Sequence, residues 1–178
     1  MKSLATWLAR SDQFLIQLVN CHWKCRVLDW LMPWVTHLGG ARATIGFLSA
    51  WLLFMPRNVK MWAVEALVAL ATSHLAVMFL KKFLPRIRPY LKLTHLHTFP
   101  NPLTDYSFPS GHTTAAFSIA LTFSLHSSLL MMVLIPYAIM IGFSRMYLAL
   151  HYPTDVLIGV FLGSSFALAT VRLFDLWC

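Results

Sequence analysis

The sequence predicts an all-α protein, a polytopic transmembrane helical bundle of five to six spans with an N-terminal interfacial helix. Three observations lead to this fold class. Hydrophobic residues make up 58% of the 178 residues and charged residues 11%, whereas soluble domains average about 45–50% and about 25%. The apolar residues form runs close to the roughly 20 residues that cross a bilayer. Polar stretches that contain proline separate these runs. The composition therefore excludes a soluble domain and a disordered chain.

Residues 1–40 are expected to form an amphipathic region rather than a clean span. Apolar residues recur in it at helical spacing, but charged residues and a proline lie between them. The stretch lacks the apolar core and cleavage site of a signal peptide, so we expect it to be retained. If residues 14–38 do cross the bilayer, the bundle has six spans instead of five. Cys21 and Cys25 are interpreted as ordinary apolar residues, with a small metal or redox site as the alternative.

Residues 41–178 are expected to form the transmembrane core and, with residues 1–40, a single domain. The first span follows the Gly39-Gly40 break, stops at Pro56 and reaches full length by including residues before the break. The second is a clean apolar run. Small residues in the third, and two glycines separated by three residues in the fifth, favour close helix packing. The five predicted spans are 41–55, 61–80, 113–125, 129–147 and 156–174.

The second span contains two ionisable residues, Glu65 and His74, at a spacing that places them on roughly one face of a helix. Ionisable groups within a membrane segment are functional candidates. We favour a polar pair packed inside the bundle, and a proton relay is the alternative.

The net charge of +8 comes from 14 Lys and Arg residues against 6 Asp and Glu residues. On an apolar chain this excess indicates phosphate headgroups or the positive-inside bias rather than nucleic acid. Much of the charge lies in 81–92, and no acidic residue occurs between Glu65 and Asp105. We therefore expect these cations to be available for an anionic ligand.

Three clusters contain the candidate catalytic and binding residues. Two predicted spans separate the first two clusters from the third, so all should meet on one side of the membrane. The clusters are Lys81-x6-Arg88-Pro89, Pro109-Ser110-Gly111-His112 and Ser144-Arg145-x5-His151-x3-Asp155.

The cations of these clusters match the oxygens of a phosphate. Arginine offers a planar fork of donors and lysine a point charge. For Lys81 and Arg88, phosphate binding and interfacial anchoring both remain open. Anchoring is favoured for the neighbouring Lys82, Arg86 and Lys92.

The second cluster opens a helix. Ser110 is a preferred helix cap, and Gly111 allows a ligand to approach the backbone. The free amides of the first turn form an anion site. His112 would stand beside it, placed to protonate a departing oxygen.

The third cluster pairs a histidine with a carboxylate one helical turn later. Asp155 can accept a proton from one imidazole nitrogen of His151, which leaves the other nitrogen as a nucleophile. Arg145 can reach the same site. The three clusters together provide what phosphoryl transfer through a phosphohistidine requires. No carboxylate cluster suits a catalytic metal, so the predicted chemistry needs no metal and no cofactor.

In these three clusters the chain resembles the type 2 phosphatidic acid phosphatase (PAP2) superfamily, whose signature is KxxxxxxRP, PSGH and SRxxxxxHxxxD. The residues match all three motifs in order. The resemblance implies that Lys81, Arg88 and Arg145 bind the phosphate. It also implies main-chain contacts from Ser110 and Gly111. The soluble vanadium haloperoxidase branch does not fit the apolar composition.

The same resemblance implies the catalytic roles. His151 would be the nucleophile, His112 the general acid, and Asp155 the residue that orients His151. The reaction of the family is hydrolysis of a phosphate ester or diphosphate on a lipid. The small size of this chain resembles bacterial undecaprenyl-diphosphate phosphatases and phosphatidylglycerophosphate phosphatases.

We therefore expect a multi-pass lipid phosphatase of the cell membrane that acts on undecaprenyl diphosphate. A phosphatidylglycerophosphate or phosphatidate phosphatase is the alternative enzyme. A lipid-binding or transport protein with a relict site is the alternative of another class. The expected partners are the bilayer and a lipid with a phosphate or diphosphate headgroup, with no nucleic acid and no protein partner. Arg57 and Lys60 lie in a short loop that the positive-inside rule places in the cytoplasm, which puts the active site on the outer face.

Overall fold

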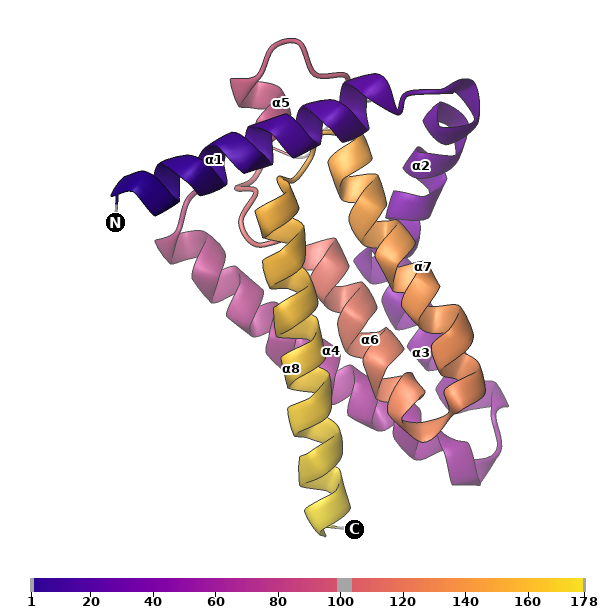
Figure 1. Cartoon of the computed structure of the whole chain (residues 1–178). Helices are drawn as coiled ribbons and strands as arrows, with labels where there is room; N and C mark the ends of the chain where they lie inside the picture. The colour runs from indigo at the N-terminus through magenta and orange to yellow at the C-terminus, as the bar shows by residue number, and fades with distance from the viewer. Residues whose placement is uncertain (1, 99–103, 178) are drawn as a thin grey trace.

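The computed structural model describes residues 2–98 and 104–177, and these residues form helices joined by loops (Figure 1). This confirms the all-α prediction. A π-helical turn, Leu18–His22, follows the first helix. The α-helices are α1 (Lys2–Gln17), α2 (Arg26–Leu38), α3 (Ala41–Phe54), α4 (Arg57–Phe83), α5 (Pro89–Lys92), α6 (Gly111–His126), α7 (Ser128–Tyr147) and α8 (Pro153–Trp177).

Helix α6 forms the centre of the bundle and packs against α4, α7 and α8. Small side chains on α8 allow this close approach, as the two glycines of the fifth predicted span indicate. A Cβ atom on Gly163 would lie 2.5 Å from the carbonyl oxygen of Thr114, and one on Gly159 would lie 2.9 Å from that of Ser110. The hydrophobic core surrounds α6, whose buried side chains pack with those of α2 and α7 and with those of α3 and α4. The start of α6 is held against the start of α8.

Three of the described helices, α4, α7 and α8, are long and apolar enough to cross a membrane. They contain the predicted spans 61–80, 129–147 and 156–174. The other two predicted spans are also helical, but α3 has 14 residues and α6 has 16. Only Gly39 and Gly40 separate α2 from α3. The residues before the glycine pair, which the first predicted span includes to reach full length, are therefore also helical.

Helix α1 lies across one end of the bundle, over the tops of α7 and α8 (Figure 1). Trp7 and Phe14 are exposed, while Ile16 packs on Leu96 and Tyr152 beneath the helix. A helix that presents large apolar side chains away from the protein suits the membrane interface. The N-terminal interfacial helix of the predicted fold is therefore present.

The two free thiols lie in different local structures, Cys21 in the π-helical turn and Cys25 in extended backbone before α2. One expectation outside the three clusters is wrong. Glu65 does not pair with His74. Its carboxylate instead lies 2.6 Å from Nε2 of His126, at the far end of α6. The predicted spacing was measured along one helix, whereas the partner comes from a neighbouring one.

Candidate active site

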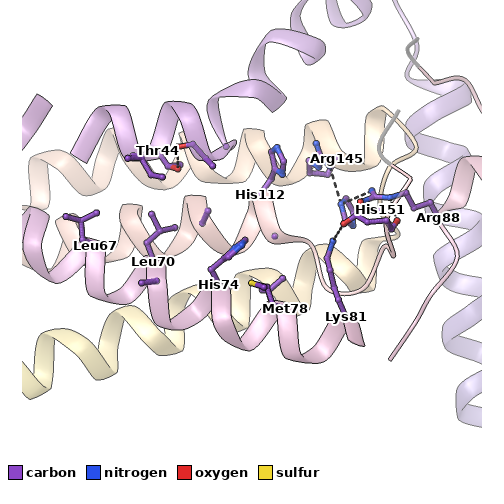
Figure 2. A pocket seen from close by; sticks show the side chains of 18 residues that line it. Thr44, Leu67, Leu70, His74, Met78, Lys81, Arg88, His112, Arg145 and His151 are labelled. Atoms are coloured by element: carbon purple, nitrogen blue, oxygen red, sulfur yellow. Dashed lines mark hydrogen bonds and ion pairs between the residues drawn. The ribbon is translucent and has the colours of Figure 1, made fainter. Parts of the chain in front are cut away.

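The three sequence clusters meet around one cavity of about 640 Å³ (Figure 2). Lys81 reaches it from the end of α4, His112 from the start of α6 and Arg145 from the end of α7. Arg88 and His151 reach it from the loops that follow α4 and α7. This arrangement confirms that the clusters share one side of the bundle.

A tight turn between α7 and α8 brings His151 next to Arg145. The amides of Leu150 and His151 both donate to the carbonyl oxygen of Arg145, at 3.0 and 3.2 Å. Ala149 adopts a left-handed conformation with φ 55° to close the turn. The SRxxxxxHxxxD spacing therefore describes a helix end, a compact turn and a new helix.

His151 is buried and held in a defined orientation. Its Nδ1 donates to the carbonyl oxygen of Ser107 at 2.6 Å, which leaves Nε2 without a proton. Nε2 lies 3.2 Å from Nη1 of Arg88 and 3.3 Å from Nη2 of Arg145. Burial and the charges of Arg145 and Arg88 lower the pKa of His151 well below its ordinary value. The imidazole is therefore neutral and directs a lone pair toward two cations in the cavity.

Arg88 is fixed by backbone acceptors. Its Nε donates to the carbonyl oxygen of Asp105 at 2.7 Å, and its Nη1 donates to that of Leu150 at 2.9 Å. The guanidinium is only 1% exposed. Because the fork is oriented before any ligand arrives, little side-chain entropy is lost on binding.

Arg145 keeps part of its donor capacity unused. Nη1 donates to the Thr36 hydroxyl at 2.6 Å, but Nε, although buried, has no hydrogen-bond partner among the described residues. An unpaired buried donor costs free energy, and an oxyanion in the cavity would remove that cost. This is the property expected of a phosphate-binding arginine.

The expectation that no acidic residue neutralises the loop cations is wrong. Asp105 forms ion pairs with both Lys81 and Arg88. Burial alone would raise the pKa of Asp105, but the hydrogen bonds and charges of these two partners outweigh it and lower the pKa to about 2. The acid lies 24 residues from Lys81 along the chain, so only the folded loop brings them together.

The start of α6 presents backbone rather than the Ser110 side chain. The Ser110 hydroxyl bonds to Oγ1 of Thr113 at 2.8 Å and does not cap the helix amides. Ser110 is fully buried, whereas Gly111 lines the cavity. A Cβ atom on Gly111 would contact only Val77, at 3.7 Å, so packing does not require glycine there. The absence of a side chain leaves the cavity open at the helix start.

His112 lies against the glycine pair between α2 and α3. A Cβ atom on Gly39 would lie 2.7 Å from Ile141 and 3.3 Å from the Cβ of His112, so this close approach requires glycine. His112 lines the same cavity as His151, and both are labelled in Figure 2.

Asp155 lies behind His151 and is fully buried. The spacing predicts that it accepts the Nδ1 proton, but its Oδ2 is 3.8 Å from Nδ1, and the Ser107 carbonyl oxygen is the nearer acceptor. Oδ2 accepts instead from the amide of Tyr152 at 2.9 Å, and Oδ1 accepts from Arg86 at 2.6 Å. Asp155 therefore fixes the backbone next to His151 as well as facing its ring.

Sequence reasoning did not identify three residues near the site. Arg86, interpreted as an interfacial anchor, bonds to Asp155 and Asp12. Ser107 provides the acceptor for His151 through its backbone, which no side-chain pattern reveals. No nearby sequence pattern identifies Asp12, because its hydrogen-bond partners lie more than 70 residues away along the chain.

Beyond the charged residues the cavity continues as an apolar channel between α3 and α4. Leu67, Leu70, Ala71 and Met78 of α4 line one wall and Ile45 of α3 the other. His74 of α4 also faces this channel (Figure 2). The shape suits a molecule with a charged head and a long apolar chain.

The family model described as "PAP2 superfamily" matches residues 62–177, which include all three clusters. The undecaprenyl-diphosphatase of Sulfolobus acidocaldarius is 28% identical over 160 residues, which are 89% of this chain and 76% of that protein. Phosphatidylglycerophosphatase B of Bacillus subtilis is 31% identical over 152 residues, which are 76% of this chain and 70% of that protein. The crystal structure of Aquifex aeolicus LpxE superimposes with a TM-score of 0.80 at 29% identity, covering 89% of this chain and 93% of the other.

Proposed function

Because the chain belongs to the PAP2 superfamily of lipid phosphatases, we propose that it hydrolyses undecaprenyl diphosphate to undecaprenyl phosphate through a phosphohistidine intermediate. The observation that carries this proposal is the position of His151. Its unprotonated Nε2 faces the cavity between the guanidinium groups of Arg88 and Arg145. A nucleophile surrounded by phosphate-binding donors is the arrangement that phosphoryl transfer needs.

The proposed reaction has two steps. Burial and the charge of Arg145 lower the pKa of His112 to about 2 before substrate binds, so His112 takes up its proton together with the anionic substrate, whose charge offsets that of the cations. Nε2 of His151 then attacks the terminal phosphorus, the bond from phosphorus to the bridging oxygen breaks, and His112 donates this proton to the departing lipid phosphate. Water then attacks the phosphohistidine, gives a proton to His112 and releases inorganic phosphate. Lys81, Arg88 and Arg145 stabilise the charge on the phosphoryl oxygens throughout. In this mechanism the cations do the work that a metal ion does in other phosphatases.

Two features support a polyprenyl diphosphate as the substrate. The lining of the cavity is charged around His151 and apolar between α3 and α4, so the part of an apolar chain next to a diphosphate can contact the apolar residues. A relative that covers most of this chain carries the name undecaprenyl-diphosphatase. The relative named phosphatidylglycerophosphatase B supports phosphatidylglycerophosphate or phosphatidate as the alternative substrate. We further propose that the site lies on the outer face of the membrane, because Arg57 and Lys60 mark the opposite end of α4.

A substrate panel tests the proposal. The purified protein in detergent micelles is given undecaprenyl diphosphate, phosphatidylglycerophosphate and phosphatidate, with and without a chelator, and phosphate release is measured. We expect the highest kcat/KM for undecaprenyl diphosphate, no effect of the chelator, and no release by His151→Ala. Acid-labile, base-stable phosphate should be recovered on the wild-type protein after rapid quenching.

The alternatives give different results. A higher kcat/KM for either phospholipid would reassign the substrate, and full activity of His151→Ala would contradict the nucleophile. A wild-type protein that releases phosphate from none of the lipids and does not bind orthovanadate would favour the relict site.

A further inference from the structure

We propose that Arg86 and Asp12 are positioning residues for the phosphatase reaction, and that α1 is thereby part of the catalytic apparatus. Arg86 and Asp12 together hold Asp155 and the first turn of α8, on which the placement of His151 depends. This inference rests on the proposed function and assigns a task to residues outside the three motifs.

Arg86 connects three segments of the chain. Nη1 donates to Oδ1 of Asp155 at 2.6 Å and to the Thr154 hydroxyl at 2.8 Å, and Nη2 donates to Oδ2 of Asp12 at 2.7 Å. The guanidinium also lies over the ring of Tyr152, 3.9 Å from its centroid. Both carboxylates are almost completely buried, with exposures of 4% for Asp12 and 0% for Asp155. Arg86 is therefore the cation that makes two buried negative charges tolerable.

Asp12 caps a helix to which it does not belong. Its Oδ1 accepts the Thr154 amide at 3.0 Å and its Oδ2 accepts the Thr154 hydroxyl at 2.6 Å. Thr154 is in the first turn of α8, where the amides have no partner within the helix. An acidic side chain at this end also interacts favourably with the helix dipole. α1 thus supplies a capping carboxylate for α8.

These contacts reach the nucleophile through the backbone. Asp155 accepts the amide of Tyr152, the residue after His151, and its own carbonyl oxygen accepts the amide of Ser110. The amide of Ser107, whose carbonyl oxygen orients His151, donates to the carbonyl oxygen of Arg86 at 2.9 Å. A shift of Arg86 would therefore move both the turn that carries His151 and the acceptor that orients its ring.

The position of Arg86 separates this role from phosphate binding. Arg86 and Asp12 are not among the residues that line the cavity, whereas Lys81, Arg88 and Arg145 are. Loss of a positioning contact should reduce kcat without weakening the binding of a phosphate-like anion. A general loss of structure would weaken both.

The test uses the full-length protein in micelles with the best substrate of the panel. Asp12→Asn and Arg86→Gln remove the ion pair, and Arg86→Lys keeps the charge but not the fork. Arg10→Gln on α1 and Lys82→Gln near the loop are matched controls, because both side chains are exposed and each change removes one positive charge. kcat, KM and the inhibition constant of orthovanadate are measured for each variant.

We expect kcat to fall roughly 10- to 100-fold in Asp12→Asn and Arg86→Gln, the factor that a charged hydrogen bond of ordinary strength represents. KM and the vanadate constant should stay within about twofold of the wild type, and Arg86→Lys should recover part of kcat. Arg86→Gln alone leaves the buried carboxylates of Asp12 and Asp155 without their cation, whereas the Asp12→Asn/Arg86→Gln double variant leaves only that of Asp155. It should lose no more activity than Arg86→Gln alone, because the two residues act through one network.

Two outcomes would overturn the positioning role and leave the proposed function intact. One is kcat values equal to those of the controls, and the other is vanadate inhibition constants that rise in step with the loss of kcat. An inactive wild-type protein would instead contradict the proposed function, and the positioning role with it.

Discussion

His151 acquires its chemical character from neighbours that are distant in the chain. The Ser107 carbonyl oxygen, 44 residues away, accepts a hydrogen bond from Nδ1, and Arg88, 63 residues away, faces Nε2. An isolated histidine with a pKa near 6.5 is partly protonated at neutral pH and does not distinguish its two nitrogens. In the folded protein the imidazole is neutral and its proton is on Nδ1, so the lone pair of Nε2 is free to act as the proposed nucleophile.

At the residue scale, Gly111→Ala should separate activity from stability. The added methyl group would contact only Val77, at 3.7 Å, so the melting temperature should not change. The methyl group would occupy the cavity at the start of α6, however, and displace a bound phosphate. We expect kcat/KM to fall on the order of 100-fold, as a displacement of about 1 Å can cause. Gly46→Ala, with open space around it in α3, is the matched control, and equal activity of the two variants would contradict this role.

The Asp105 ion pairs predict a pH dependence of stability. The folded-state pKa of about 2 lies below the ordinary value of 3.8, so the folded protein stays ionised where the unfolded chain binds a proton. This contribution is therefore complete above about pH 5 and is lost as the pH falls toward about 2. Melting curves of wild type and Asp105→Asn should differ by a constant amount from neutral pH to about pH 5. The difference should shrink at lower pH, and a change near pH 6 would contradict it.

At the scale of elements, the α6–α8 contact depends on the absence of side chains. Helix α6 begins at the candidate active-site cavity and α8 begins beside His151, so their contact fixes the position of His112 relative to His151. The two glycines of α8 place its backbone directly on that of α6.

Gly163→Ala should therefore destabilise the protein. Its Cβ atom would lie 2.5 Å from the carbonyl oxygen of Thr114 and 2.9 Å from the amide nitrogen of Ser118, both of which are backbone atoms. We expect the free energy of unfolding to fall by about 1–3 kcal/mol, the usual cost of overpacking. Gly46→Ala, which meets nothing within 4 Å, should leave it unchanged or raise it. Thermal unfolding in detergent measures both, and equal melting temperatures would show that α8 can shift without cost.

The elements also show where sequence reasoning succeeds and fails. The runs that became α4, α7 and α8 could be predicted because length and apolar composition decide membrane spans. The meeting of the three motifs at one cavity could be predicted because the number of spans between them places them on the same side of the bundle. The partners of Arg86, Asp105 and Glu65 could not, because each contact joins helices or loops whose packing no local pattern encodes.

At the scale of the whole molecule, the orientation in the membrane can be tested with two cysteine substitutions. Thr94 is exposed in the loop on the catalytic side, and Asn58 is exposed at the opposite end of α4. In a background without the native cysteines, Thr94→Cys should react with a membrane-impermeant maleimide on intact cells. Asn58→Cys should react only after permeabilisation. The reverse pattern would place the catalytic cavity in the cytoplasm.

The two buried guanidinium groups have a kinetic consequence as well as a catalytic one. Arg88 is fixed by backbone acceptors, and Nε of Arg145 has no partner within residues 2–98 and 104–177, so the cavity is ready for an oxyanion before substrate arrives. Inorganic phosphate, the final product, presents the same kind of oxygens to Arg88 and Arg145 as the phosphoryl group of the substrate. It has no apolar chain whose affinity for the bilayer would favour its release. We therefore expect inorganic phosphate to dissociate slowly. Phosphate in the surrounding medium should then inhibit the enzyme and reduce the rate at which the lipid is dephosphorylated.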